Sequence, residues 1–513
     1  MNKYITIIRW LVISLLLASC AENKKLLEKK PNIIFIYVDD LGYGDVSCYG
    51  ATSVNTPNVD ALASGGLQFT DAHCSASTCT PSRFALLTGS YAFRNNAAIL
   101  PGDAPLIINT RQETIASMLK KSGYTTGVIG KWHLGLGNGK PDWNADIKPG
   151  PLEIGFDYSF LIPATPDRVP TVFVENHRVV NLNITDPIQV NYNEPIGSEP
   201  IGLENEEMLK MRADTQHSGT VVNGISRIGF MSGGHSAYWK DEDFPIVLAN
   251  KAKTFMEENN DKPFFLYFSL PDIHVPRAPN QRFIGKTSMG PRGDAIVQMD
   301  WMTGEISKKL KELGIADNTL IIFSSDNGPV LDDGYADNAV TNLGSHKPAG
   351  IYKGGKYSAY EGGTRVPTIA YWPGKIKPGK SDAMISQVDF FATIAKLVDQ
   401  KITDNKTAPD SFELLDLLLG NSNKGREEMI EEAFTLSIRS GNWKYIAPQT
   451  KPTPGWLANK DVATGLQFTA QLYNLKDDPK EENNLAMKFP EKVKELALKL
   501  EQVMKEPINR SGS

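Results

Sequence analysis

The sequence predicts an α/β protein built on a parallel, doubly wound sheet. Short continuous apolar runs suit strands buried on both faces, and amphipathic stretches with helical spacing lie between them. The length of 513 residues, with 41% hydrophobic and 22% charged residues, is ordinary globular composition. It excludes a disordered, collagenous or coiled-coil chain. The formal net charge of −5 argues against a nucleic-acid binder that works through bulk positive charge.

The expected strands and helices alternate along the first two thirds of the chain. The strands are residues 33–38, 125–129, 264–270 and 320–323. One helix is expected from Pro57, with Thr56 as its cap, to a stop at Gly65-Gly66. Two more are expected over residues 113–121 and 296–313, each followed by a glycine that ends it.

The rest of the chain has a different character. Residues 160–240 are rich in Pro, Asn and Gly and are expected to form long loops. Residues 438–446 and 466–473 are expected to be antiparallel strands, and residues 490–505 a charged amphipathic helix. We therefore expect a large domain over residues 31–425 and a C-terminal subdomain over residues 426–513.

The first twenty residues have the features of a secretory signal. Lys3 and Arg9 precede an apolar core that is too short to span a bilayer comfortably. The following Leu-Ala-Ser-Cys resembles a bacterial lipobox, which implies that Cys20 becomes a lipidated membrane anchor; an incidental cysteine after a plain signal is the alternative. Residues 21–30 are expected to be a polar tether. The protein is thus expected outside a bacterial cytoplasm, as a periplasmic, outer-membrane or surface lipoprotein.

Three cysteines remain if Cys20 is lipidated, and an odd count argues against a disulfide framework. Cys48 and Cys74 could pair, but small buried thiols are the favoured interpretation. Cys79 needs an explanation of its own.

Polar side chains follow each of the four expected strands, and the carboxyl ends of such strands form the ligand site of open α/β sheets. Any one of these groups alone would be ordinary turn chemistry. Together they supply oxygen ligands that suit Ca²⁺, with Mg²⁺ as the alternative, rather than Zn²⁺. These candidate ligands are Asp39, Asp40, Asp326 and Asn327. Cations and proton donors accompany them, which indicates an anionic substrate. They are Lys131, His133, His274 and Lys356.

The segment Cys79-Thr80-Pro81-Ser82-Arg83, followed by Leu87-Thr88-Gly89, resembles the signature of the type I sulfatases. A buried cysteine beside a turn proline is the alternative. Further resemblances lie at residues 31–45, 130–135, 354–367, 440–445 and 472–485. The resemblance implies an alkaline-phosphatase-like large domain, with a mixed, mostly parallel sheet flanked by helices. It also implies a smaller α+β C-terminal subdomain with an antiparallel sheet.

In that family the signature cysteine is oxidised to formylglycine, so the resemblance implies a maturation enzyme that converts Cys79. Its hydrate would attack sulfur and form a covalent sulfo-enzyme. Asp326 would accept the proton of the attacking hydroxyl, and Arg83 and Lys131 would hold residue 79 and the sulfate. Lys356 and His274 would bind sulfate and protonate the leaving oxygen. His133 would take the proton of the second hydroxyl, which expels sulfate. The metal would be bound by the four ligands above and residue 79.

The implied substrate is a sulfated glycan fragment. Residues 163–172 and 327–335 resemble bacterial sulfatases grouped with N-acetylgalactosamine-6-sulfatase and galactose-6-sulfatase, which implies exo-acting removal of 6-O-sulfate. Expected sugar contacts are Thr165, Asp167 and Arg168, with a loop ion pair as the alternative. Three further histidines are weaker pocket candidates, expected mostly to be loop residues: His177, His235 and His346.

Two other functions stay open. One is a phosphodiesterase or phosphonate monoester hydrolase of the same superfamily, although the lysine-rich, single-metal pattern favours sulfate. The other is a surface lipoprotein that binds sulfated glycan without turnover because Cys79 is not converted.

Overall fold

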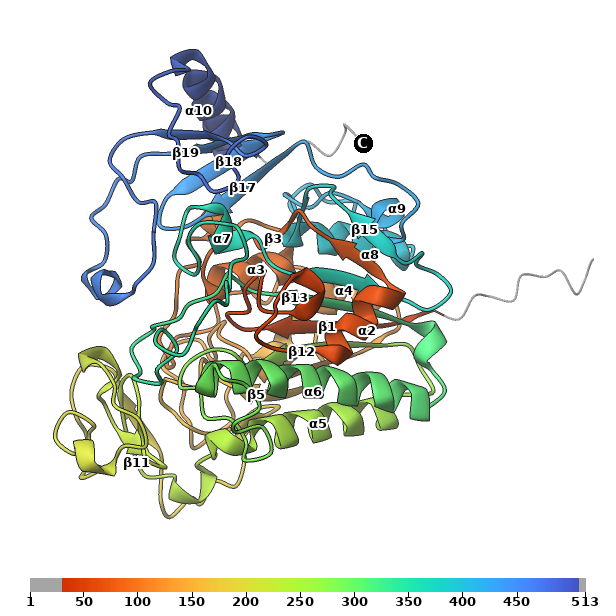
Figure 1. Cartoon of the computed structure of the whole chain (residues 1–513). Helices are drawn as coiled ribbons and strands as arrows, with labels where there is room; N and C mark the ends of the chain where they lie inside the picture. The colour runs from red at the N-terminus through yellow and green to blue at the C-terminus, as the bar shows by residue number, and fades with distance from the viewer. Residues whose placement is uncertain (1–29, 507–513) are drawn as a thin grey trace, which may run out of the picture.

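The computed structural model describes residues 30–506 and centres on a ten-stranded sheet with helices on both faces (Figure 1). The expected signal, the lipidation site Cys20 and all but the last residue of the expected tether lie outside the described residues. Within residues 30–506, no helix is long and apolar enough to cross a membrane.

The middle of the sheet is parallel and its edges are mixed. β1 (Asn32–Val38) lies between β12 (Phe264–Leu270) and β13 (Thr319–Ser325), and β4 (Thr125–Lys131) and β5 (Tyr158–Ile162) continue the parallel run beyond β12. β14 (Thr368–Tyr371) pairs antiparallel with β13. All four strands expected from the sequence are confirmed, and β4 and β13 extend beyond their expected ends. The predicted α/β class is confirmed.

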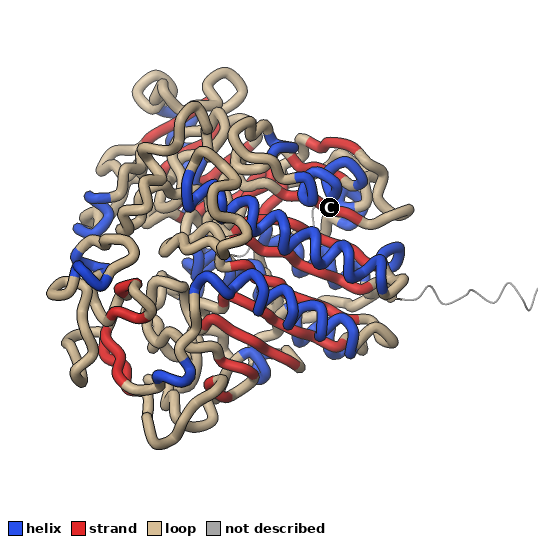
Figure 2. Tube along the Cα trace, turned by 60° about the horizontal axis from the view of Figure 1, so that its bottom comes forward, coloured by secondary structure: helices blue, strands red, loops and turns tan. Residues whose placement is uncertain are grey.

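Buried side chains explain why these runs form central strands. Ile34, Ile36 and Val38 pack into a hydrophobic core on the side of the long helices α5 (Phe244–Glu258) and α6 (Gly290–Glu312). Ile33, Phe35 and Tyr37 alternate with them and pack into a second core on the opposite face. Figure 2 shows α5 and α6 side by side across one face of the sheet.

The expected helices form, with shifted ends. α2 (Pro57–Gly65) begins at Pro57 as predicted, but the hydroxyl of Thr56 makes no capping bond; it lies 2.8 Å from the hydroxyl of Ser47. α4 (Ile115–Lys121) begins at a capping box formed by Thr114 and Ser117. α6 begins at Gly290 rather than 296, because Pro291 can occupy the first turn of a helix.

Short elements complete the chain, and after β5 the loop-rich middle region contains only short strands and short 3₁₀ turns, as expected. The remaining helices are α3 (Cys79–Thr88), α7 (Glu361–Thr364), α8 (Phe390–Leu397) and α9 (Leu415–Leu418). The remaining strands before residue 400 are β2 (Leu67–Phe69), β3 (Ala72–His73), β6 (Val174–Glu175), β7 (Arg178–Val179), β8 (Gln189–Asn191), β9 (Val221–Val222), β10 (Ile225–Ser226), β11 (Phe230–Ser232), β15 (Gly379–Ser381) and β16 (Ile385–Ser386).

A four-stranded antiparallel sheet lies near the C-terminus, with α10 (Pro490–Lys505) packed on it (Figure 1). Its strands are β17 (Glu428–Glu432), β18 (Leu436–Ser440), β19 (Trp443–Ile446) and β20 (Gln471–Asn474). The prediction of a single strand over 438–446 is therefore wrong. Gly441, at a φ of 56°, turns the chain so that β18 and β19 form a hairpin. The strand expected to begin at residue 466 begins at Gln471. The domain boundary between residues 425 and 426 stays a prediction.

Candidate active site

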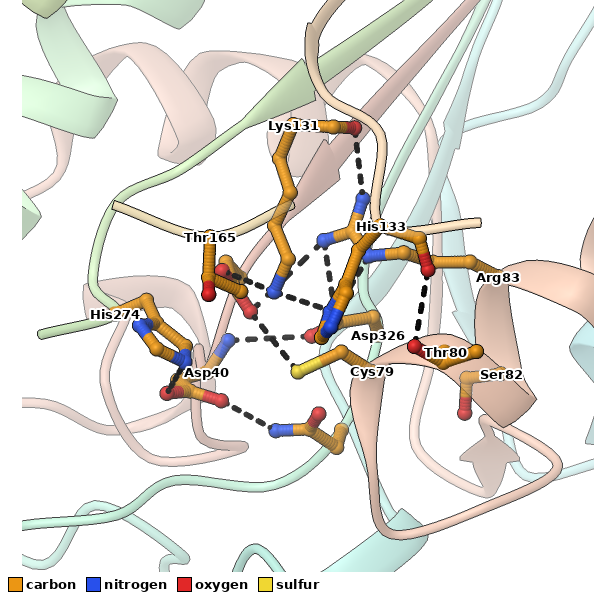
Figure 3. A network of polar contacts seen from close by, with 12 residues as sticks. Asp40, Cys79, Thr80, Ser82, Arg83, Lys131, His133, Thr165, His274 and Asp326 are labelled. Carbon is orange, nitrogen blue, oxygen red and sulfur yellow. Dashed lines mark hydrogen bonds and ion pairs between the residues drawn. The ribbon is translucent and has the colours of Figure 1, made fainter. Parts of the chain in front are cut away.

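Parallel register brings the predicted site residues together at one edge of the sheet. Val38 lies opposite Leu270 on one side and Ser325 on the other, so Asp39, Asp326 and the loop after β12 emerge side by side. Lys131 is the last residue of β4. Cys79 begins α3, whose N-terminus faces the same edge (Figure 3). A helix N-terminus favours anions, which suits a negatively charged substrate.

Four candidate metal ligands form a compact buried cluster. The ligand atoms of Asp39, Asp40, Cys79 and Asp326 all lie within 4.8 Å of one another. Asn327 donates from Nδ2 to Oδ1 of Asp40 over 2.7 Å, and its buried Oδ1 has no partner within residues 30–506. Three carboxylates and an unpartnered amide oxygen are the donor chemistry of a hard cation. The residues present therefore fit Ca²⁺.

Cations interleave with these carboxylates. Arg83 binds Oδ2 of Asp326 from Nε at 2.9 Å and from Nη2 at 2.7 Å. Lys131 Nζ lies 2.5 Å from Oδ2 of Asp39, and Lys356 Nζ lies 2.9 Å from Oδ2 of Asp40. Burial alone would raise the pKa of Asp326, but Arg83 and Lys131 hold that pKa below its usual value. The site thus keeps Asp326 ionised.

Lys356 also lies 3.1 Å from Asp333, a residue not predicted from the sequence. Burial opposes the charge of Lys356, yet Asp333 and Asp40 outweigh it and raise the pKa of the ammonium well above its ordinary value. Lys356 is therefore a permanent cation beside Cys79 in the cavity described below.

The two catalytic-candidate histidines are held as neutral imidazoles. His133 Nε2 lies 2.9 Å from the carbonyl of Leu100, while its buried Nδ1 has no partner in the described chain. Burial and the charge of Lys131 lower the pKa of His133 well below its ordinary value. His274 Nδ1 lies 2.6 Å from the carbonyl of Val275, and burial, assisted by Lys356, lowers the pKa of His274 to about 4. His133 thus offers a ring nitrogen that can accept a proton.

A cavity of about 180 Å³ opens above this cluster, with Cys79, His133, His274 and Lys356 in its wall. Arg83 and Lys131 are fully buried and contact the carboxylates beneath. The cavity is lined by Cys79, Ile99, His133, Asp167, Arg168, Gln216, His217, Ile228, His274, Asp333, Lys356, Tyr357 and Trp456. The predicted catalytic and metal residues therefore converge on one place.

The expected sugar contacts form one connected group, of which Asp167 and Arg168 line the cavity and Thr165 lies buried behind them. Arg168 Nη1 lies 3.0 Å from Oδ1 of Asp167, and the hydroxyl of Thr165 donates to the same carboxylate. His217 joins them, with Nε2 at 3.4 Å from Asp167 and Nδ1 at 2.6 Å from Asp214. His217 was not predicted from the sequence, where its only local signal is Asp214, three residues before it.

The three weaker histidine candidates lie outside this cavity and bind carboxylates elsewhere. His177 pairs with Glu153, His235 with Asp186 and Glu199, and His346 with Asp45. In the described range, Cys48, Cys74 and Cys79 are all free, so no disulfide joins Cys48 to Cys74.

The profile of the sulfatase family matches residues 31–400. The chain belongs to the sulfatase family. It is 52% identical over 479 residues to the N-acetylgalactosamine-6-O-sulfatase of Bacteroides thetaiotaomicron, which covers 93% of each chain. It is 31% identical to human arylsulfatase A, over 92% of this chain and 86% of that one. This sulfatase is thus a sulfuric ester hydrolase, as the signature around Cys79 predicts.

Solved structures agree with this assignment. A structure from work on glycosaminoglycan metabolism by Bacteroides thetaiotaomicron has a TM-score of 0.91 and 52% identity, and it covers 93% of this sulfatase and 100% of its own chain. A phosphonate monoester hydrolase of Agrobacterium radiobacter has a TM-score of 0.56 at 18% identity, over 92% of this chain and 95% of that one. The second likeness concerns the fold alone.

Proposed function

We propose that the protein removes 6-O-sulfate from a terminal N-acetylgalactosamine or galactose of sulfated glycans, as an exo-acting enzyme. The observation that carries the proposal is the 52% identity, over 93% of both chains, to an N-acetylgalactosamine-6-O-sulfatase. The small cavity above Cys79 supports exo action, because it suits one sulfated sugar rather than the middle of a chain.

Each side chain of the site has a task in ester cleavage. Lys356 binds the sulfate and places its ammonium beside the leaving oxygen as a proton donor. His274 lines the same cavity and can donate from Nε2 only when its ring is protonated, because Nδ1 bonds the carbonyl of Val275. Asp326, held ionised by Arg83, accepts the proton of the attacking group. Nδ1 of His133 accepts the next proton, which releases sulfate from residue 79.

Two groups complete this chemistry when present. Formylglycine at position 79, made by a maturation enzyme of the host, would supply a hydrated aldehyde as nucleophile. A Ca²⁺ ion held by Asp39, Asp40, Asp326 and Asn327 would offset charge on the sulfate oxygens.

Recognition of the sugar is assigned to the group formed by Thr165, Asp167, Arg168 and His217. The Arg168 fork and the Asp167 carboxylate offer donors and acceptors in fixed geometry, and His217 adds a ring that bridges Asp167 and Asp214. Such a set can distinguish the orientation of ring hydroxyls, because a mismatched hydroxyl leaves a buried polar group without a partner.

Sulfate release from a panel of sugars sulfated at positions 6, 4, 3 and 2 tests the proposal. The 6-sulfated N-acetylgalactosamine or galactose is expected to react fastest, Cys79→Ala to abolish release, and the control Cys48→Ala to keep it. Faster turnover of a phosphodiester or phosphonate ester would instead support the hydrolase alternative. Equal rates at all four positions would overturn the assignment to position 6.

The state of residue 79 is read first, by peptide mass on protein from its native host. Conversion to formylglycine lowers the mass by about 18 Da. An unmodified Cys79 in the host would overturn hydrolysis and leave the glycan-binding lipoprotein.

We also propose that the mature protein is anchored outside the cytoplasm through a lipid on Cys20, on the basis of the lipobox-like Leu-Ala-Ser-Cys. Cys20→Ala is expected to move the protein from the membrane fraction to the soluble fraction. Unchanged fractionation, or a mature N-terminus at another residue, would overturn the anchor.

A further inference from the structure

Three aromatic rings meet at the edge of the cavity. The ring centroids of Tyr357 and Trp456 are 5.1 Å apart, those of Phe434 and Trp456 are 6.0 Å apart, and those of Tyr357 and Phe434 are 6.4 Å apart. We refer to Tyr357, Phe434 and Trp456 as the aromatic rim. Two of its members, Tyr357 and Trp456, line the same cavity as Cys79.

The aromatic rim joins two distant parts of the chain. Tyr357 directly follows Lys356, and its hydroxyl lies 3.1 Å from Oδ2 of Asp333. Trp456 lies on a short 3₁₀ turn, Gly455–Asn459, in the connection between β19 and β20 of the small sheet. That connection therefore supplies part of the cavity wall.

Polar contacts hold this connection in place. Lys460 Nζ lies 3.3 Å from Asp333 and 3.4 Å from Asp214, and the hydroxyl of Ser358 donates to the carbonyl of Ala463 over 2.7 Å. The amide of Ala359 donates to the carbonyl of Thr464 over 2.8 Å. These contacts anchor the chain within eight residues after Trp456, which restricts where its ring can lie.

Core packing does not account for the rim. Phe434 is 42% exposed and adopts a φ of 55°, a backbone conformation that bulky side chains rarely occupy. Trp456 is only half-buried. An exposed aromatic surface that continues from a polar catalytic cavity is the pattern of a ligand-binding surface.

The chemistry of the substrate selects the occupant. A sulfated sugar that presents its ester to Cys79 fills the cavity floor, so its glycosidic link must leave through the cavity mouth. The next sugar of the glycan then meets the rim. The apolar C–H face of a pyranose packs on an aromatic face, while indole N–H and phenol O–H groups can bind its hydroxyls.

We propose that the aromatic rim is a second sugar subsite, which stacks against the sugar linked to the sulfated one. The inference rests on the proposed function, since it takes the sulfated glycan as substrate. It assigns Trp456 and Phe434 a role in selecting oligosaccharides over monosaccharides.

Kinetics on two substrates test the subsite. We compare kcat/KM for a 6-sulfated N-acetylgalactosamine monosaccharide and for a disaccharide that carries the same sugar at its non-reducing end. The wild type is expected to prefer the disaccharide. In Trp456→Ala the ratio of the two values is expected to fall by about tenfold, mainly through KM, as for a central aromatic contact. Trp456→Phe is expected to retain most of the ratio.

Phe468→Ala is the matched control, since Phe468 is 69% exposed, lies on the same connection and does not line the cavity. It is expected to keep the wild-type ratio. An equal loss on both substrates in Trp456→Ala, or no disaccharide preference in the wild type, would overturn the subsite while leaving the proposed function intact.

If the wild type releases no sulfate from either sugar, the proposed function is overturned. A binding measurement then tests the subsite separately from the proposed function. Isothermal titration of unconverted protein with the unsulfated disaccharide reads the rim directly. The subsite is supported if the wild type and Trp456→Phe bind the disaccharide and Trp456→Ala does not. It is contradicted if all three proteins bind with equal affinity, or if none of them binds.

Discussion

The ammonium of Lys460 lies 3.3 Å from Oδ1 of Asp333, the carboxylate that also binds Lys356. Lys460 also lies 3.4 Å from Asp214, and Asp214 binds His217, which lines the cavity. A lysine beyond the predicted boundary of the large domain therefore connects the Asp333–Lys356 pair with the Asp214–His217 pair.

Lys460→Met is expected to lower both activity and stability. The substitution leaves Asp333 buried with one cation fewer, and breaking a buried ion pair typically costs about 3–5 kcal/mol of unfolding free energy. Because Asp333 also positions Lys356, kcat/KM should fall too. Urea unfolding and sulfate release measure the two effects, with Lys460→Arg as the charge-preserving control. Wild-type values for Lys460→Met would show that the ion pair is not needed.

Removal of the cation is expected to lower stability and abolish turnover. A ligand that binds only the folded state adds about 2.7 kcal/mol at 100 times its dissociation constant. The thermal midpoint should therefore drop in a chelator and recover with Ca²⁺. Asp40→Asn should lose most of this response, while Asp261→Asn, at an exposed site, should keep it. A midpoint that ignores chelator and Ca²⁺ alike would contradict the metal assignment.

The parts of the site that the sequence predicts are those next to strand ends. Continuous apolar runs precede Asp39-Asp40, Lys131 and Asp326-Asn327. Parallel strands bring their carboxyl ends to one edge of the sheet, independently of the conformation of the loops. Cys79 could be found because its signature is local, with a fixed spacing to Pro81 and Arg83. Neither inference needs knowledge of long-range packing.

The residues that escaped prediction come from loops that only the folded chain brings together. His217, Asp333 and Trp456 belong to three separate segments, and no spacing links them. The helix α5 also was not predicted, but for a different reason: its buried residues Leu248, Ala252 and Phe255 do have helical spacing in the sequence. That signal was present, in the part of the chain between the loop-rich region and β12.

His217 is expected to make stability depend on pH. Burial opposes its charge, but the carboxylates of Asp167 and Asp214 outweigh this and raise the pKa of His217 above its ordinary value. A raised histidine pKa adds stability that is complete below the unfolded value of about 6.5 and is lost as pH rises through the native value. The difference in unfolding free energy between wild type and His217→Gln should therefore be largest in acid.

Urea titrations of both proteins, at pH values below about 6.5 and well above it, measure the effect. Lys460, which also contacts Asp214, is left unchanged in both proteins. A difference that stays constant would show that folding does not shift the pKa of His217, and one that grows with rising pH would show that folding lowers it.

A buried charge cluster joins α7 to the small sheet and supplies the last prediction. Lys444 of β19 is fully buried and lies 3.0 Å from Glu361, 3.1 Å from Glu431 and 3.7 Å from Glu481. Although burial raises the pKa of Glu361, Lys444 and Arg439 hold it well below its ordinary value. The cluster thus keeps Glu361 ionised inside the protein.

Lys444→Met is expected to destabilise the fold by about 3–5 kcal/mol, because it leaves buried carboxylates with less positive charge. The surface control Lys505→Ala, whose side chain is 76% exposed, should change stability by less than about 0.5 kcal/mol. Urea unfolding at neutral pH measures both. A small effect of Lys444→Met would mean that the folded cluster takes up a proton instead, on Glu361 or Glu431, since burial already raises the pKa of Glu481 to about 8 and keeps that carboxyl largely protonated at neutral pH. Proton release on unfolding at neutral pH, compared between the two variants, distinguishes that outcome from a cluster that does not contribute to stability.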